Sequence, residues 1–423
     1  MALCLSAAMV AAPCMGACES QALASWLAGQ GIRGGANSQE ASSAQTRLPF
    51  RTHPDDELTR SGLALFYNMD YDAAIAKSRE EMQAHPDDPF VVNHALAAIL
   101  AKELNREGAF DAALYTGNRF MELKPEPVDP KVKAEIVELA EKAQALATSA
   151  LKKNPNDTNA LYARAAARGY EALFYAVVEK RWLAALRHSL GSYHDDEEVL
   201  KLDPNNSDAK FIVGSMLYVV GGLSWYERMM AFVISLHGNK KQGLQLLREA
   251  ANGGGAATMD ARMFLSLFLA REKQYEEPIA LMRQSYAEFP RNFIYGFSEA
   301  ELLAASGERD AAISTYRELI AAGEKNQFPN ARSESAAMAL GELFRKAKDY
   351  KNAAEAFDEA AKFPHPNNAI VAHCDLEGGQ MYDLLGLRET AVVRYDMAQH
   401  LAPGSDDARE AERYLRHLYE GSE

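Results

Sequence analysis

A recurring spacing of small and aromatic residues near the C-terminus constrains the fold of this chain more than any other feature. In the last unit a small residue, Gly379, is followed three positions later by an aromatic residue, Tyr382. Twelve positions after the glycine comes Ala391, and it is followed by an aromatic residue and a second alanine, Tyr395 and Ala398. The unit before it has the same spacing, with Gly341, Phe344, Ala353, Phe357 and Ala360. Such a pattern predicts repeated pairs of helices.

The spacing has a simple explanation in helix packing. Two antiparallel helices can approach closely only where small residues lie at the contact. Gly379 and Ala391 are the expected contact points, with Tyr382 and Tyr395 filling the space beside them. Pro403 is expected to end the second helix, because proline cannot continue the backbone hydrogen-bond ladder. The pattern therefore indicates architecture and no catalytic chemistry.

Weaker copies of the unit extend over most of the chain. We count roughly eight or nine helix pairs, including one long pair over residues 157–203. Strand signals, such as alternating β-branched runs between Asn-Gly turns, are nearly absent. The sequence thus predicts an all-α solenoid over residues 51–423. The weaker copies are carried by Gly62, Ala74 and Pro86, by Ala113 with Pro125, by Ala143 with Pro155, by Pro278 with Pro290, and by Ala300 with Ala312.

Composition and charge agree with a helical solenoid and disfavour one class of partner. Hydrophobic residues make up 48% of the chain and charged residues 25%, which suits a buried core with a solvated exterior. The net charge is −14, and the densest charge cluster, residues 195–198, is acidic. Because nucleic-acid binding needs a basic stripe, we expect no nucleic-acid partner.

The N-terminus resembles an export signal. Residues 1–18 contain an apolar stretch followed by small residues, although a positively charged start is missing. Cys18 is a lipidation candidate, because Met-Gly-Ala-Cys partly matches the bacterial lipoprotein motif. The alternative is an unremarkable disordered leader. Residues 19–50, rich in Gly, Ser, Ala and Gln, are expected to be a flexible linker.

No constellation of residues predicts an enzyme. His373, Cys374 and Asp375 are consecutive, so on a helix their side chains point about 100° apart and cannot form a triad. The segment from Gly238 to Leu244 has the glycines of a phosphate loop but Leu244 in place of the required lysine. Histidines and cysteines show no metal-ligand spacing. We therefore expect no catalytic residue, no metal and no cofactor.

Residues 223–238 interrupt the repeat frame. Trp225, Met229, Phe232, Val233 and Leu236 follow helical spacing and predict an amphipathic helix too short to span a bilayer. Three roles are open for it: lying on a membrane surface, capping a groove, or packing against its own solenoid. Peripheral membrane contact is therefore a prediction for this insertion, as it is for the leader.

Because of these repeated units, residues 55–423 resemble the tetratricopeptide-repeat superfamily, and residues 334–404 resemble it most closely. The superfamily members that the chain resembles include bacterial repeat proteins of unassigned function. The resemblance implies a right-handed superhelix whose first helices line a concave groove for a peptide or protein partner. The family's groove positions are the second, fifth, ninth, twelfth and thirteenth of each unit. Here they correspond to Met338, Glu342, Arg345, Lys346, His373, Leu376, Gln380 and Asp383.

The resemblance implies a non-catalytic interaction scaffold, and two settings for it are open. The first is an exported, periplasmic or membrane-anchored scaffold; the second is a soluble intracellular regulatory or substrate-presenting adaptor. Some members of the family bind a C-terminal carboxylate through Lys, Asn and Arg at defined groove positions. We do not expect such binding here, because the fifth and ninth positions of the first two units are Thr59, Leu63, Ala98 and Lys102. A capping helix is predicted over residues 405–420, where apolar residues recur at helical spacing.

Overall fold

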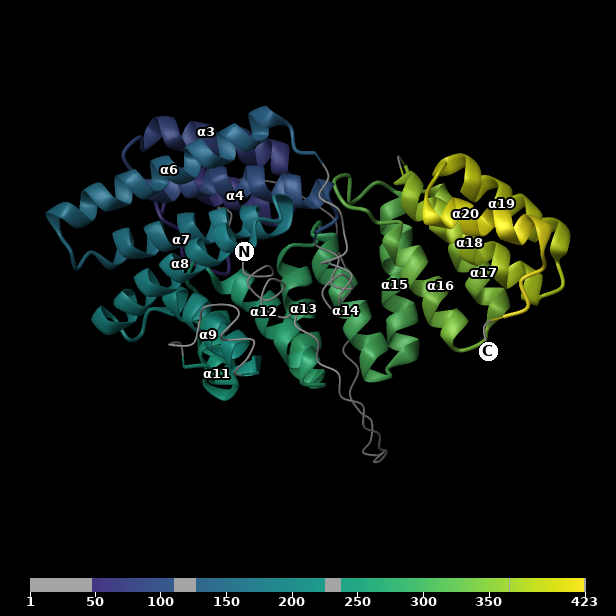
Figure 1. The fold of residues 1–423 in the computed structure, drawn as a ribbon. Helices are drawn as coiled ribbons and strands as arrows, with labels where there is room; N and C mark the ends of the chain where they lie inside the picture. Colours follow the sequence, from purple (N-terminus) through teal and green to yellow (C-terminus); the bar gives the residue numbers. More distant parts are fainter. Residues whose placement is uncertain (1–47, 110–126, 225–236, 365, 422–423) are drawn as a thin grey trace, which may run out of the picture.

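The computed structural model describes residues 48–109, 127–224, 237–364 and 366–421. These residues form α-helices with short connections and contain no strand, which confirms the all-α prediction. The helices follow one another along a curved, solenoid-like array (Figure 1). Consecutive helices pack against each other throughout, so the array consists of antiparallel pairs. The leader at 1–18 and Cys18 lie outside the described residues.

Eight helix pairs and a terminal helix make up the described array, in agreement with the predicted number. The first helices of the pairs are α2 (Glu57–Tyr67), α4 (Pro89–Arg106), α7 (Thr158–Leu173), α9 (Ser207–Gly222), α12 (Thr258–Arg271), α14 (Phe293–Ser306), α16 (Ser335–Lys346) and α18 (Asn368–Leu384). The second helices are α3 (Tyr71–Ala84), α6 (Pro130–Lys153), α8 (Trp182–Leu202), α11 (Lys240–Asn252), α13 (Glu276–Glu288), α15 (Arg309–Glu324), α17 (Tyr350–Glu359) and α19 (Arg388–Leu401), and α20 (Asp406–Arg416) closes the array.

A short sequence signal sets where most first helices begin. An Asp or Asn precedes the helix, and its side-chain oxygen accepts a hydrogen bond from a backbone N–H of the first turn. In four cases a proline stands two residues earlier and cannot continue the helix of the preceding pair. These proline and cap pairs are Pro86 with Asp88, Pro155 with Asp157, Pro204 with Asn206, and Pro290 with Asn292.

The predicted contact points between paired helices are confirmed. A Cβ atom added to Gly379 would lie 2.5 Å from Cε1 of Tyr395, and one added to Gly341 would lie 2.5 Å from Cε1 of Phe357. Tyr395 and Ala391 are fully buried. The glycine of each first helix is therefore needed because the aromatic ring of the second helix lies directly against its backbone.

The middle of the chain departs from the regular unit as expected. Helix α7 continues as a π-helix over Phe174–Val178, which lengthens the pair with α8. Helices α9 and α11 approach backbone to backbone, since a Cβ on Gly243 would lie 2.6 Å from the carbonyl oxygen of Gly214. Within the segment from Gly238 to Leu244, Gly243 therefore permits this close packing. Asn239 caps the N-terminus of α11. Residues 225–236 of the predicted insertion lie outside the described residues.

The N-terminal hairpin of α2 and α3 folds back onto the middle of the array. Asn292 donates through Nδ2 to the carbonyl oxygen of Tyr67 at 2.7 Å, although the two residues lie 225 positions apart. Arg291 pairs with Asp70 at 2.7 Å, and Asn330 donates to the carbonyl oxygen of Met69 at 2.9 Å. The solenoid thus closes on itself between its first hairpin and the turns before α14 and α16.

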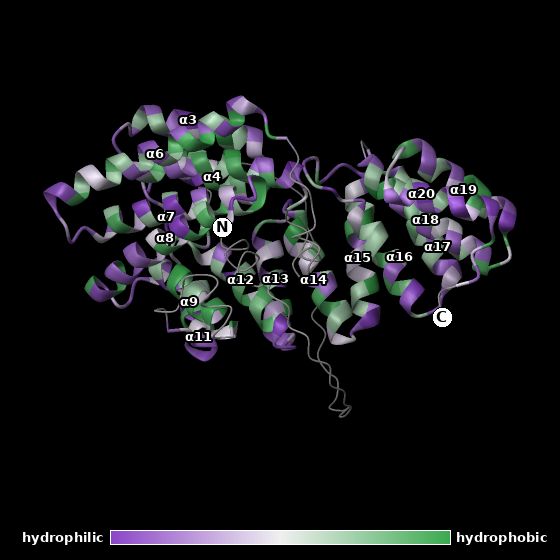
Figure 2. Cartoon of the chain, viewed as in Figure 1, coloured by the Kyte–Doolittle hydropathy of each residue, from purple (hydrophilic) through white to green (hydrophobic). Residues whose placement is uncertain are grey.

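Two predicted boundaries need correction. Leu48 and Phe50 pack in the core, with the Phe50 ring 5.2 Å from that of Tyr67, so the folded part begins before residue 51. The capping helix predicted over 405–420 is α20, which ends at Arg416. It buries Ala408, Ala411 and Tyr414. Hydrophilic and hydrophobic residues are mixed along most helices of the array, and hydrophilic residues predominate along α20 (Figure 2).

Candidate functional site

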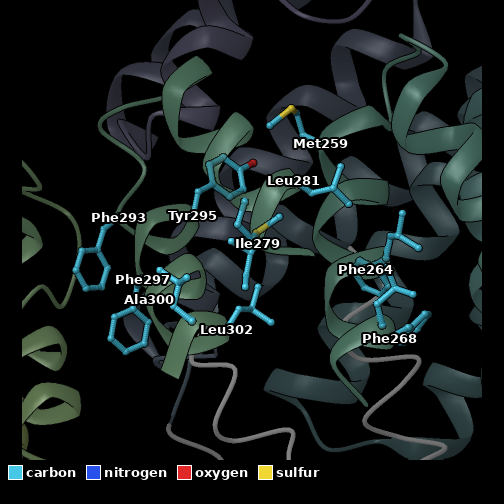
Figure 3. Close-up of a cluster of buried hydrophobic side chains, with 14 of the residues drawn as sticks. Met259, Phe264, Phe268, Ile279, Leu281, Phe293, Tyr295, Phe297, Ala300 and Leu302 are labelled. Atoms are coloured by element: carbon cyan, nitrogen blue, oxygen red, sulfur yellow. The ribbon is translucent and has the colours of Figure 1, made fainter. Parts of the chain in front are cut away.

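A partly open cavity of about 480 Å³ lies where the solenoid closes on itself. One wall is formed by the first helices α12 and α14, and the opposite wall by the α2 and α3 hairpin. Figure 3 shows buried side chains of α12, α13 and α14 in one cluster, with Met259, Ile279 and Tyr295 among them. Apolar wall residues include Phe66, Tyr71, Met263, Phe264, Leu267, Ile294 and Leu302.

A second, smaller cavity of about 70 Å³ adjoins the first, and Phe66, Tyr67 and Asp260 line both. Asp260 lies in the first turn of α12, at the junction of the two cavities. The smaller cavity continues between α4, α7 and α9, where Tyr162 and Tyr170 contribute to its lining. Asp260 is therefore the carboxylate that both cavities share, and several aromatic side chains lie in the same lining.

The charge of that carboxylate acts on four buried tyrosines. Burial raises the pKa values of Tyr67, Tyr170 and Tyr295, and the charge of Asp260 is the next largest cause for each of them. The same charge contributes to the raised pKa of Tyr162. These four phenols therefore stay protonated at neutral pH.

Polar atoms without partners also face this interior. Ser266, on α12, lines the larger cavity with 3% of its surface exposed, and its Oγ atom has no hydrogen-bond partner among the described residues. The Oδ1 atom of Asn93, which lines the smaller cavity, is likewise unpartnered. Buried polar groups are nearly always hydrogen-bonded, so the unpartnered Ser266 and Asn93 oxygens need a structural or functional explanation.

The eight predicted groove residues fall into two groups. Met338, Glu342, Arg345 and Lys346 lie on α16, and Lys346 is the member that lines the large cavity. Arg345 joins two helices, because it pairs with Glu342 at 2.8 Å and with Glu377 of α18 at 3.4 Å. Partner binding by these four residues stays a prediction.

The other four residues, on α18, are mostly covered by the end of the chain. Leu376, Gln380 and Asp383 have 5% or less of their surface exposed. His373 pairs with Asp407 of α20, whose hydrogen bond raises the histidine pKa. Three of the predicted groove residues are thus interior residues of the terminal unit, because α19, α20 and the segment after α20 pack over them.

Asp383 in particular holds the terminal segment in place. Its carboxylate accepts hydrogen bonds from Arg388 at 2.8 and 3.1 Å, from the Tyr395 hydroxyl at 3.0 Å and from the Tyr419 backbone N–H at 2.9 Å. Arg388 also donates to the carbonyl oxygens of Tyr414 and Leu415 at the end of α20. This carboxylate is structural, and a partner does not reach it while α20 is docked.

The remaining sequence candidates have ordinary surroundings. Cys374 is buried, and burial raises the pKa of its thiol, which disfavours the reactive thiolate. Across the described ranges no group of three or more His, Cys, Asp and Glu side chains could hold a metal ion. Within those same ranges no helix combines the length and apolar character needed to cross a membrane.

The cavity residues could have been found from the sequence by applying the groove positions to the middle units. The unit that contains Pro278 places Asp260, Met263, Leu267 and Ala270 at groove positions, and all four line the cavity. The next unit places Ile294, Glu301 and Ala305 there, and these line it too. Only the two better-formed C-terminal units were used for the prediction, and the end of the chain covers the second of them, on α18.

The fold and the cavity together define the class of protein: an all-α solenoid of antiparallel helix pairs with a large, partly open cavity. No family model matches the chain, and no curated protein matches it. Solved structures similar in fold include PilF of Pseudomonas aeruginosa, with 16% identity, a TM-score of 0.34, and coverage of 59% of this chain and 96% of PilF.

Two further structures are similar in the same way. YrrB, a TPR protein with an unusual peptide-binding site, has 15% identity and a TM-score of 0.30, with coverage of 63% of this chain and 97% of YrrB. A tetratricopeptide repeat protein from Parabacteroides merdae has 13% identity and a TM-score of 0.29, with coverage of 79% and 97%. These likenesses concern the arrangement of helix pairs alone.

Proposed function

We propose that this chain is a non-catalytic interaction scaffold that holds an extended segment of a partner protein in the large interior cavity. The observation that carries the proposal is the cavity itself, whose volume of about 480 Å³ is in the range of ligand sites, roughly 300 to 1,000 Å³. Its walls are largely apolar, with a few polar side chains set among them. That combination suits an apolar segment whose orientation a few polar contacts select.

The cavity is also placed where a solenoid binds partners. Its longest walls are first helices, α12 and α14, which line the inner side of the superhelix. The α2 and α3 hairpin covers the opposite side and restricts what can enter. An extended chain fits this space better than a folded surface, because a folded partner would have to displace the hairpin.

A cross-linking experiment tests the location of the partner segment. Ala305 is exposed and lines the cavity at the end of α14, whereas Ala311 is an equally exposed alanine on α15 outside the cavity. A photoreactive amino acid at position 305 should cross-link to the partner, and the same residue at 311 should not. Equal labelling from both positions, or labelling from 311 alone, would contradict the proposal.

A matched pair of bulky substitutions gives an independent measurement. Ala305→Trp should obstruct the cavity and abolish binding of the cross-linked segment, while Ala311→Trp should leave binding unchanged. Circular dichroism of both variants establishes that the fold is retained. Undiminished binding to folded Ala305→Trp protein would place the partner elsewhere on the solenoid.

We further propose that the scaffold is exported or membrane-tethered through residues 1–18, with Cys18 as the lipid acceptor. The support is the apolar leader and the partial lipoprotein motif. Fractionation of the native host should find the protein in the envelope, and Cys18→Ser should release it from the membrane. Recovery of cytosolic protein that retains Met1 would favour the intracellular adaptor instead. The insertion at 223–238 stays a second candidate for membrane contact.

We propose no nucleic-acid partner, on the basis of charge. The net charge of −14 and the carboxylates in the cavity lining would repel phosphates. A gel-shift assay with single-stranded RNA and DNA at low salt should show no complex. Binding that weakens steeply with added salt would overturn this part of the proposal.

A further inference from the structure

The turn that joins the two helices of the long pair exposes a large apolar side chain. Leu183 has 74% of its surface exposed, more than any other large hydrophobic residue in the part of the chain that the structure describes. It lies in the first turn of α8, which begins at Trp182. A single exposed leucine is common on a protein surface and needs no explanation by itself. The charges around Leu183 distinguish it from the others, and residues 180–187 are called the basic turn below.

The exposed charge around Leu183 is positive. Lys180, Arg181 and Arg187 lie within four positions of it, and residues 180–194 contain no Asp or Glu. Arg181 and Arg187 are both exposed. Because the chain as a whole carries a net charge of −14, the basic turn is a local reversal of its sign.

Two carboxylates lie close to the basic turn, and each already has a basic partner. Glu179 pairs with Lys133 of α6 at 2.6 Å. Glu171 lies 3.0 Å from Nδ1 of His188. Both carboxylate side chains are mostly buried, so they do not cancel the exposed guanidinium groups of the turn.

The backbone and two aromatic rings hold the basic turn in place. The π-helix that extends α7 ends at Val178, and the Arg181 N–H donates to the carbonyl oxygen of Tyr175 at 2.7 Å. The Arg181 guanidinium lies 5.1 Å from the centre of the Tyr175 ring, and the Lys180 ammonium group lies 6.0 Å from that of Trp182. Tyrosine and tryptophan favour the level of the headgroups at a membrane surface. The turn thus presents one apolar side chain among cations, with two aromatic rings behind them.

We infer that the basic turn binds the surface of an anionic lipid bilayer. Leu183 enters the boundary between headgroups and acyl chains, and Arg181 and Arg187 contact the lipid phosphates. A bilayer offers negative charge and an apolar layer at adjacent depths, which is the combination that this turn complements. A nucleic acid would satisfy the arginines but would gain nothing from the exposed leucine. The inference depends neither on the interior cavity nor on residues 1–18.

Tryptophan fluorescence of the full chain tests this inference at the turn itself. The chain has three tryptophans, so Trp26→Phe together with Trp225→Phe leaves Trp182, next to Leu183, as the only one. Vesicles of equimolar phosphatidylcholine and phosphatidylglycerol with brominated acyl chains should quench Trp182. Brominated vesicles of phosphatidylcholine alone should need at least about tenfold more lipid for the same quenching, because attraction to anionic lipid is roughly a fivefold effect for each basic residue.

Substitutions in the basic turn should shift the lipid titration. Leu183→Ser should require about tenfold more anionic lipid, because serine loses the apolar contact. Arg187→Gln should require about fivefold more. Leu183 and Arg187 are both exposed, so thermal unfolding of these variants should match that of the unsubstituted chain.

Two matched variants outside the turn serve as controls. Leu387→Ser changes another exposed leucine, in the turn after α18, where the neighbouring Arg388 is paired with Asp383. Arg317→Gln removes an exposed arginine on α15. Neither control should change the quenching of Trp182.

Each other outcome contradicts the inference in a recognisable way. If the chain floats with anionic vesicles while Trp182 is not quenched, another segment carries the membrane contact, and the inference is wrong while the proposed tethering stands. If neutral and anionic vesicles quench equally, or if Leu183→Ser leaves the titration unchanged, the turn is not the lipid-binding surface. Absence of any vesicle binding, with a salt-sensitive complex formed by RNA instead, would assign the arginines to nucleic acid and overturn the inference.

Discussion

Replacing Asp383 by alanine should release the terminal helix α20 from the array. The Asp383 side chain is fully buried and accepts hydrogen bonds from Arg388, Tyr395 and Tyr419. Without the carboxylate, the Arg388 guanidinium, whose side chain is 33% exposed, loses its ion pair and keeps only its bonds to the Tyr414 and Leu415 carbonyl oxygens. The Tyr395 hydroxyl and the Tyr419 N–H lose the acceptor that they share. Removing one member of a buried ion pair costs 3 to 5 kcal/mol, and the partial exposure of Arg388 favours the lower end, about 3 kcal/mol.

Hydrogen exchange is the appropriate assay, because repeat proteins open locally and a single global unfolding energy is poorly defined. A loss of about 3 kcal/mol corresponds to exchange roughly a hundredfold faster. The amides of Ala408 to Arg416 should show this acceleration, while those of α12 and α14 exchange at the wild-type rate.

Asp406 provides the matched control for this prediction. Its side chain is 94% exposed and pairs only with Arg409, so Asp406→Ala should change exchange by less than about threefold, as is usual for surface ion pairs. If α20 in Asp383→Ala exchanges within threefold of the wild type, or if both substitutions accelerate it equally, the buried carboxylate does not hold the terminal helix.

Two further substitutions test the helix contacts and a buried acid. Gly379→Ala should destabilise the terminal unit by about 1 to 3 kcal/mol, because the added Cβ would lie 2.5 Å from Tyr395. In Gly378→Ala the nearest atom outside the local helix is 3.5 Å away, so that variant should be neutral or slightly stabilised in thermal unfolding. Asp196 is fully buried on α8 with no partner for either carboxylate oxygen among the described residues, and burial raises its pKa well above the usual value. Because its folded pKa is raised, stability is greatest below the unfolded pKa of about 3.9 and falls as pH rises towards the folded value. Asp196→Asn should therefore raise the unfolding midpoint at pH 8 and reduce its fall between pH 5 and 8, and an unchanged pH dependence would contradict the assignment.

Local rules in the sequence determined the helix pairs of this protein. The small and aromatic spacing of Gly379, Ala391 and Tyr395 predicted contacts that the structure shows, because the residues concerned lie within one helix hairpin. The prolines and Asx residues between pairs act over two or three positions and set helix ends in the same local way. For this reason the all-α solenoid, the long pair at 157–203 and a terminal capping helix could all be predicted.

The candidate site depended on contacts between residues that are far apart in the sequence, and local rules do not predict such contacts. Small rotations between successive pairs add up along a solenoid, and their sum decides whether its ends meet. Here they bring Tyr67 to Asn292 and Arg332 to the turn after α4, which encloses the cavity between α2, α12 and α14. The same packing buries Leu376 and Asp383 against α20 and its following residues. The sequence alone therefore determined which residues pair within each hairpin, whereas only the tertiary structure decided which first helices line a cavity, because that depends on the path of the whole chain.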